Sequence, residues 1–252
     1  MDISSEKIKE LKERGFILSK DRNHFSVRIL SGNGTMTGAQ LRYLADAAER
    51  FGQGTLSFTS RLSVEMPGVP LEHIEPLSEF LSLNNLDTGG TGPKIRPVTC
   101  CKGTVCVHGM IDTQGFALEL HERFYKGWHD IVLPAKFKIG VGGCPNNCAK
   151  PSLNDFGISG WTQLDETGTR VPAYKITIGG IWGKTQRIGT PIEGVFTKKQ
   201  VIEVLEKTLT IWMEEAEPKE RFGRYLERVG TETFINKLQN QIPRTPEDRR
   251  EQ

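Results

Sequence analysis

Apolar and polar positions in the first third of the chain repeat with a helical and then a strand-like period. Residues 4–14 have the spacing of a short amphipathic helix that Gly15 ends. The stretch HFSVRIL (24–30) alternates apolar and polar residues, as a half-buried strand does. The same reasoning predicts a helix from Thr37 to Phe51, a strand over 54–66 and a helix over 70–83. We therefore predict a small ferredoxin-like α+β layer over about 20–85.

The loop NNLDTGGTGPK (84–94) separates this layer from a mixed α/β part of the chain. There the pattern predicts a helix at 112–124, a strand at 130–143, a strand from 173 into a glycine-rich loop, a long helix at 197–215 and a last helix at 218–230. The predicted fold class is α+β. The predicted division is an N-terminal helix (1–20), a ferredoxin-like half-domain (21–90), a mixed α/β domain (91–240) and a flexible tail (241–252).

Composition narrows the class of protein. The 252 residues are 37% hydrophobic and 25% charged, which is typical of a globular protein with a buried core. A net charge of +2 gives no basis for a nucleic-acid or membrane-surface partner. The N-terminal stretch lacks the apolar core of a secretory signal, and no run approaches the roughly 18 apolar residues of a membrane span. We expect a cytoplasmic protein.

Cysteines are the first sign of chemistry. The chain has five of them, in two groups: Cys100, Cys101 and Cys106, and then Cys144 and Cys148. An odd, clustered set without an export signal argues against a disulfide framework. Two groups about 40 residues apart are typical of two halves of a metal site, although free cysteines are also common core residues.

The spacing leaves two kinds of metal site open. Cys144 and Cys148 fit structural zinc, whereas the first group is too wide for a zinc knuckle. The tight ferredoxin run and a redox C-x-x-C pair are both absent from the sequence, which favours a four-thiolate iron–sulfur site built from two loops. Gly142 and Gly143 allow backbone to approach a bulky group beside Cys144.

A lysine pair precedes the second cysteine group. Lys136 and Lys138 alternate by two on the strand predicted over 130–143, so both should point to one side. A K-x-K pair is often only a solvated face, but this strand leads into the loop that carries the thiols. We therefore expect an anionic ligand beside the metal site.

These motifs together resemble the siroheme-dependent sulfite and nitrite reductase family. GCPNNCAKPSLNDFGI (143–158) is similar to its siroheme–cluster signature, CCKGTVCVHGMIDT (100–113) to its upstream cysteine loop, and LPAKFK to its lysine pair. GTLSFTSRLSVEMPGV and DTGGTGPKIRPVTC resemble the segments that carry two arginines of the family, here Arg61 and Arg96. The similarity covers about residues 20–240. Gly142 departs from it, since the family usually has Ser, Thr or Val there.

The resemblance implies two cofactors in the 91–240 domain: a siroheme and a 4Fe–4S cluster joined by one bridging cysteine thiolate. By motif position the bridging residue is Cys148, and Cys144 and Cys106 also hold the cluster. The fourth ligand is either Cys100, which gives the usual family spacing, or Cys101, which better fits the offset from Arg96 and the Lys-Gly that follows.

The resemblance also implies roles for basic residues. Arg61, Arg96, Lys136 and Lys138 correspond to the family's cationic substrate residues, which would bind a small oxyanion and supply protons. The many carboxylates of siroheme need cationic or backbone partners. Candidates near glycine-rich turns are Arg28, Lys94, Lys184 and Arg187, together with Gly142, Gly143 and Asn146 in the signature.

The implied function is six-electron reduction of sulfite to sulfide. Nitrite reduction to ammonia is the alternative, because no residue separates the two oxyanions. Large family members hold two copies of this module, so we expect this chain to form a homodimer or to pair with a homologous subunit. Electrons would come from a separate donor such as a ferredoxin or a reductase subunit. An iron–sulfur electron carrier without siroheme and a zinc-binding interaction module are the rival hypotheses.

Overall fold

The first sheet has four antiparallel strands in a computed structural model that describes residues 3–241. Their spatial order is β1 (Phe16–Leu18), β2 (His24–Ile29), β4 (Val64–Pro70) and β3 (Ser57–Phe58). Along β2 the odd positions Phe25, Val27 and Ile29 are fully buried, so the sequence alternation places one face of the sheet in the core. This confirms the strand predicted at 24–30.

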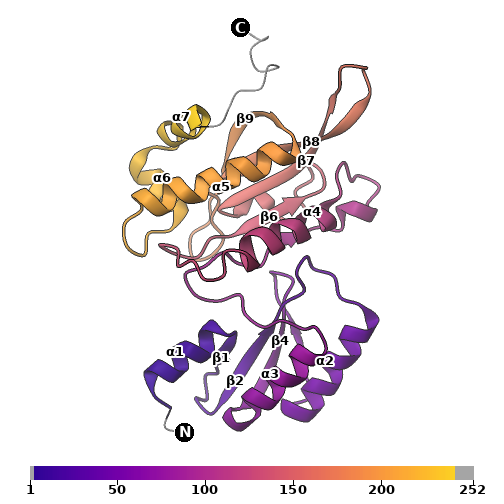
Figure 1. The fold of residues 1–252 in the computed structure, drawn as a ribbon, viewed down its shortest axis with the longest axis vertical. Coiled ribbons are helices and arrows are strands. Elements are labelled where there is room, and N and C mark those ends of the chain that lie inside the picture. The colour runs from indigo at the N-terminus through magenta and orange to yellow at the C-terminus, as the bar shows by residue number, and fades with distance from the viewer. Residues whose placement is uncertain (1–2, 242–252) are drawn as a thin grey trace. The chain divides into compact units, whose positions relative to one another are not determined.

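Helices α1 (Ser5–Glu13), α2 (Gly38–Phe51) and α3 (Ile74–Leu83) complete this part of the fold (Figure 1). The Thr37 side chain accepts from the amide of Gln40, and the Gln40 side chain accepts from the amide of Thr37, which closes a capping box at the start of α2. Helices α2 and α3 meet through Phe51 and Phe80, whose ring centroids lie 5.7 Å apart. The ferredoxin-like α+β layer expected from the sequence is therefore present.

The second sheet has five strands. They lie in the order β5 (Thr99–Cys100), β6 (Ile139–Gly142), β7 (Phe156–Leu164), β8 (Arg170–Ile178) and β9 (Thr190–Phe196). Strands β6 and β7 run parallel, whereas β7–β8 and β8–β9 are antiparallel. The mixed sheet agrees with the α/β character predicted for this half of the chain.

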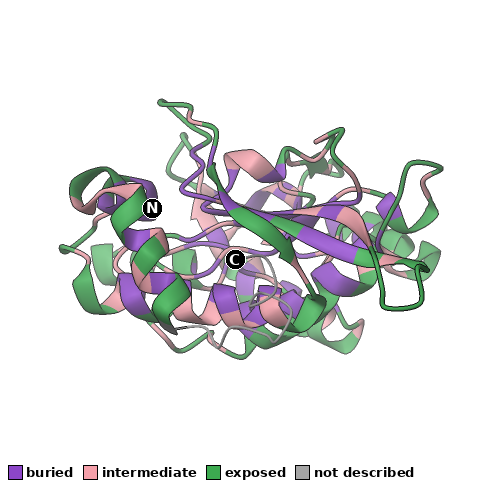
Figure 2. Ribbon diagram, turned by 90° about the horizontal axis from the view of Figure 1, so that it is seen from above, coloured by how far each residue is buried: buried purple, intermediate pink, exposed green. Residues whose placement is uncertain are grey.

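An aromatic cluster joins this sheet to three C-terminal helices, α5 (Lys198–Glu215), α6 (Phe222–Val229) and α7 (Thr231–Gln241). The Phe222 ring lies 5.4 Å from Phe137, 5.8 Å from Trp212 and 5.5 Å from Phe234, measured between centroids. Figure 2 shows buried residues along the strands and on the inner faces of the helices, and exposed residues on the outer faces and loops.

By their contacts the described residues form two compact units. The first contains the chain up to Thr99 together with Ala117–Val132, and the second contains Cys100–Phe116 together with the chain from Leu133 onward. The division at residue 90 stays a prediction about domains. The expected flexible tail (241–252) lies outside the described residues, except that Gln241 is the last residue of α7.

Two predicted strands are wrong in extent. The strand expected over 54–66 is divided into β3 and β4 by a turn at 59–63, because the Thr59 hydroxyl bonds to the Ser63 hydroxyl and accepts from the amides of Arg61 and Ser63, and Leu62 has a φ of 62°. The strand expected over 130–143 is reduced to β6. Pro134 lacks the amide hydrogen that a strand ladder needs, and the backbone bends at 134–135.

Other elements were missed by the sequence analysis. These are β1, β5, β7, β9 and α7, together with the π-helical turn His121–Lys126 that continues α4 (Thr113–Leu120). The amide of Gly127 donates to the carbonyl of Glu122 at 2.9 Å, which is the wide spacing of a π-turn.

Candidate functional site

The two cysteine groups are brought together at Gly143. The Gly143 amide donates to the Sγ of Cys101 at 3.2 Å, and the Gly143 carbonyl accepts from the amide of Met110 at 2.8 Å. Gly143 directly precedes Cys144, and Met110 closes the loop that holds Cys106. The chain therefore joins two loops, about 40 residues apart in sequence, at one backbone position.

The joint depends on the absence of side chains at Gly103 and Gly143. A Cβ on Gly143 would lie 2.8 Å from the Cα of Gly103 and 3.5 Å from the Sγ of Cys101. The Thr113 hydroxyl donates to the carbonyl of Cys101 at 2.9 Å and accepts from the amide of Thr104 at 3.0 Å. These bonds fix the first cysteine loop through the 3-10 turn Gly103–Val105.

The loop that carries the second group is shaped by two residues in the left-handed region. Asn147 has a φ of 56° and Lys150 a φ of 51°, and the Lys150 amide donates to the Asn147 carbonyl at 2.9 Å. The Asn147 side chain also donates to the hydroxyl of Ser152 at 3.0 Å. Cys148 lies between Asn147 and Lys150 and is exposed, whereas Cys144 precedes both and is half-buried.

The cysteines differ in environment. Cys101, Cys106 and Cys144 are half-buried and Cys148 is exposed, whereas Cys100 is buried. Burial, with smaller effects from Cys101 and Asp112, raises the pKa of the Cys100 thiol to about 12. Within residues 3–241 no group of three or more Cys, His, Asp or Glu side chains is arranged so that it could hold a metal ion. The donor set still fits an iron–sulfur group, because four accessible thiols come from two joined loops and a backbone N–H already points at one sulfur.

Lys136 and Lys138 lie in extended backbone before β6, on either side of the fully buried Phe137. Phe137 packs on Trp212 with centroids 5.5 Å apart, so the two lysines face away from this core. That they share a side stays a prediction, and the segment is not a regular strand. The Lys138 ammonium donates to the Trp182 carbonyl at 3.1 Å, and its amide donates to the carboxylate of Asp155 at 2.9 Å.

Arg61 and Arg96 belong to the first unit and both bond to the segment 90–97. The Arg61 guanidinium donates to the Pro97 carbonyl at 2.8 Å, from the turn between β3 and β4. The Arg96 guanidinium donates to the Gly90 carbonyl. Two of the expected substrate cations are therefore bonded to the same segment of the first unit. The other two, Lys136 and Lys138, belong to the second unit.

The candidate siroheme residues divide into two kinds. Arg28 pairs with Glu65 at 2.6 Å and donates to the Gly90 carbonyl at 3.1 Å, and Arg187 donates to Gly179, Gly223 and Glu227 at 2.6–3.0 Å. Arg28 therefore ties β2 to β4 and to the loop at Gly90, and Arg187 ties its own loop to the end of β8 and to α6. Lys184 and Asn146 are exposed, Lys94 is half-buried, and Gly142 and Gly143 are buried.

Two supporting contacts were missed by the sequence analysis. Tyr125 lies in the π-turn and its hydroxyl accepts from the amide of Gly90 at 2.9 Å; burial raises the pKa of this hydroxyl, against a lowering effect of that bond. Asp155 is fully buried and pairs with Arg221. Asp155 belongs to the motif at 143–158, but its partner Arg221 lies 66 residues further along the chain, so the sequence alone did not indicate the pair.

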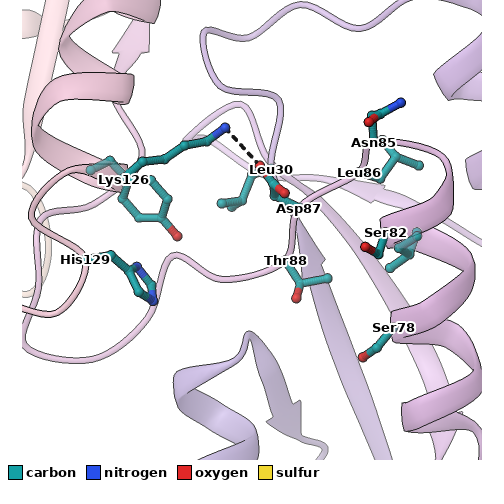
Figure 3. A pocket seen from close by; sticks show the side chains of 11 residues that line it. Leu30, Ser78, Ser82, Asn85, Leu86, Asp87, Thr88, Lys126 and His129 are labelled. Carbon is teal, nitrogen blue, oxygen red and sulfur yellow. Dashed lines mark ion pairs between the residues drawn. The ribbon is translucent and has the colours of Figure 1, made fainter.

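A separate cavity of about 700 Å³ lies in the first unit (Figure 3). Asp87 and Lys126 form an ion pair of 3.3 Å at this cavity, and the end of α3 contributes Ser78 and Ser82. None of the residues predicted for the functional site lines it.

Two cysteine loops joined at one backbone position are typical of an iron–sulfur protein. Residues 91–245 match the nitrite and sulphite reductase 4Fe-4S domain, and residues 17–83 match the nitrite/sulfite reductase ferredoxin-like half domain. Because the first match alone covers more than half of the 252 residues, the chain belongs to the nitrite and sulfite reductase family. The recognition made from the sequence motifs is confirmed.

Named relatives include both kinds of reductase. The chain is 26% identical over 223 residues to an assimilatory-type sulfite reductase of Nitratidesulfovibrio vulgaris, covering 88% of this chain and 95% of that protein. It is 27% identical over 215 residues to a nitrite reductase [NAD(P)H] of Bacillus subtilis, covering 84% of this chain and 25% of that protein. It spans half or less of the length of several curated relatives (50%, 25% and 19%).

The crystal structure of dissimilatory sulfite reductase I has the same fold, with a TM-score of 0.75 and 19% identity over 91% of this chain and 72% of that chain. Sulfite and nitrite reductases of this family use a siroheme and a 4Fe–4S cluster, the cofactor pair expected from the sequence. No helix within residues 3–241 is both long and apolar enough to cross a membrane.

Proposed function

We propose that the chain reduces sulfite to sulfide with six electrons at a siroheme coupled to a 4Fe–4S cluster. The observation that carries this proposal is the joining of the two cysteine loops at Gly143, beside the segment with Lys136 and Lys138. Sulfite is preferred because the match extends over 95% of a sulfite reductase but only 25% of a nitrite reductase. Nitrite reduction to ammonia is the second candidate.

Cys106, Cys144, Cys148 and one of Cys100 and Cys101 would hold the cluster, with Cys148 as the bridging residue. Lys94, Lys184 and Asn146 would bind siroheme carboxylates, Gly142 and Gly143 would let the backbone come close to the cofactor, and Arg28 and Arg187 would act through the segments that they hold. When bound, the two cofactors would pass on electrons from the separate donor and provide the site at which the oxyanion is reduced. These positions are our assignments, made from the motif and from the accessibility of each side chain.

The proposed roles of the cationic residues follow from their chemistry. Lys136 and Lys138 would bind the oxyanion and donate protons from Nζ as its oxygens leave as water, because an ammonium group changes its pKa readily among neighbouring cations. Arg61 and Arg96 stay charged at all relevant pH values, so they would bind and orient the oxyanion rather than donate protons.

The test is an anaerobic absorption spectrum with acid–acetone extraction and iron and sulfide analysis of the same sample. We expect an extractable tetrapyrrole and about four non-heme irons per chain. Iron and sulfide without a tetrapyrrole would instead support an electron carrier, and zinc alone would reject the enzyme. Turnover of sulfite and nitrite by the same sample, with reduced methyl viologen as donor, would decide between the two substrates.

We also propose that the active form pairs with a second copy or a homologous subunit and takes electrons from a separate ferredoxin or reductase subunit. The support is that the family match contains one half-domain, at 17–83, and one 4Fe-4S domain. Sedimentation of the active enzyme tests the pairing, since activity in a strictly monomeric species would contradict it. The cytoplasmic location stays a prediction.

A further inference from the structure

Two neighbouring cysteines, Cys100 and Cys101, compete for one place in the proposed cluster, and the backbone points them to opposite sides. Cys100 is the last residue of β5 and only 6% exposed. The Cys101 amide continues the pairing with β6 by donating to the Val141 carbonyl at 3.2 Å. Because successive side chains of extended backbone alternate, only one of the two can face the loop that contains Cys144.

The contact at Gly143 identifies which one faces that loop. The Sγ of Cys101 accepts the Gly143 N–H at 3.2 Å, one residue before Cys144. The Gly143 carbonyl accepts from Met110, which ends the turn around Cys106. Cys101 is thus bonded to the backbone position that holds both cysteine loops together. Cys100, by alternation, faces the core.

We propose that Cys101, and not Cys100, is the fourth thiolate ligand of the 4Fe–4S cluster. The assignment rests on the proposed function, because it presumes that the chain binds the cluster. Ligation exchanges the S–H bond of Cys101 for an S–Fe bond and releases the proton to solvent, with no change in oxidation state. The N–H of Gly143 then donates to a ligand thiolate, the kind of outer contact that orients metal ligands and tunes their potential.

Exchange of the two cysteines is opposed by the strand register. To bring Cys100 to Gly143 the chain would have to shift by one residue along β6, which would turn every side chain of this stretch to the other face. Such a shift would also separate the Thr113 hydroxyl from the Cys101 carbonyl, a bond of 2.9 Å. Cys100 therefore remains a buried thiol beside the cluster loop.

The pair offers its own matched control. Cys101→Ala and Cys100→Ala each remove one thiol from adjacent positions, and both variants would be purified anaerobically with the wild type. Iron and acid-labile sulfide per chain, and the low-temperature EPR spectrum after dithionite reduction, are the readouts. We expect Cys100→Ala to match the wild type. We expect the cluster content of Cys101→Ala to be lower by about tenfold or more, since even the loss of a residue that only contacts a metal ligand lowers metal affinity by about 10–100-fold.

Far-UV circular dichroism checks that each variant is folded. Cys101→Ser is a second control, because it keeps the shape of the side chain and should give either a depleted cluster or a changed EPR spectrum. Two outcomes would overturn the assignment, provided that the wild type binds four irons. One is wild-type iron content and EPR spectrum in Cys101→Ala, and the other is loss of the cluster in a folded Cys100→Ala. A wild type without iron would overturn the proposed function and the assignment together.

Discussion

The guanidinium of Arg221 lies 3.0 Å from one carboxylate oxygen of Asp155 and 3.1 Å from the other. Asp155 is fully buried, and its carboxylate also accepts the Lys138 N–H at 2.9 Å. Burial raises the pKa of Asp155, and Arg221 and the Lys138 N–H oppose that effect. One carboxylate therefore ties the lysine segment, the start of β7 and the residue before α6 together.

Neutralising Asp155 should destabilise the protein strongly. In Asp155→Asn the guanidinium of Arg221 keeps its charge in a site where only 23% of its side chain is exposed. Breaking one partner of a buried pair costs about 3–5 kcal/mol, so we expect the free energy of unfolding to fall by that amount. Urea denaturation measures the change, with the exposed Asp46→Asn as the control. A change below about 1 kcal/mol would contradict the pairing.

Removing both lysine charges should stop the chemistry and spare the cofactors. We expect Lys136→Met with Lys138→Met to lower kcat/KM for the oxyanion by about 10²–10⁴-fold, the range for positioned acid–base groups, with unchanged tetrapyrrole and iron content. Steady-state kinetics and extraction on one sample measure both. Lys199→Met, on an 87% exposed side chain of α5, is the control. Loss of the cofactors together with activity would assign the pair a structural role instead.

A methyl group at Gly143 should separate the cysteine loops. Its Cβ would meet the Cα of Gly103 at 2.8 Å, and moving the Gly143 backbone away would strain its bonds to Cys101 and Met110. We expect Gly143→Ala to lose most of its iron and sulfide. Gly38→Ala, at a position where nothing lies closer than 3.8 Å, should keep both. Wild-type metal content in Gly143→Ala would show that the joint is not required.

Stability should fall in mild acid because of His121. Burial, helped by Lys126 and opposed by Glu122 and Asp87, lowers the pKa of His121 to about 4, and its Nδ1 has no hydrogen-bond partner in the described chain. The native state therefore binds fewer protons than the unfolded chain as the pH falls from about 6.5, the ordinary pKa, towards 4. Unfolding free energies should drop by roughly 2 kcal/mol between pH 7 and pH 5.

The histidine effect has a direct check. His121→Phe keeps a ring in contact with Tyr125, whose centroid lies 4.6 Å away, and should remove that roughly 2 kcal/mol difference between denaturation curves at the two pH values. His129→Gln, at an exposed position, is the matched control. If His121→Phe keeps the full pH dependence, other groups are responsible for it.

Local signals made part of the fold predictable. Thr37 and the apolar positions after it predicted α2, because a capping residue and an apolar stripe are both local features of the sequence. The strand over 54–66 failed because its apolar pattern continues through Leu62, whereas the hydroxyl bonds of Thr59 and Ser63 make a turn there. Pattern alone does not show which of two competing sets of hydrogen bonds is made.

The candidate site shows the same limit. The cysteine motifs indicated that two loops combine, because thiol spacing is a local property of the sequence. That Gly143 is the joint, that Tyr125 supports Gly90 and that Arg221 neutralises Asp155 all depend on contacts between residues at least 33 positions apart. Such contacts depend on how distant segments of the chain pack together, which cannot be predicted from one short stretch of sequence.

The return of residues 117–132 to the first unit has a consequence for biosynthesis. On the ribosome the first unit cannot be completed until Val132 has emerged, and by then Cys100, Cys101 and Cys106 have already been made. The nascent chain therefore exposes three thiols before Cys144 exists. Delivery of the cluster proposed for these two loops would have to follow translation of the second loop, and early oxidation of those thiols is the competing reaction.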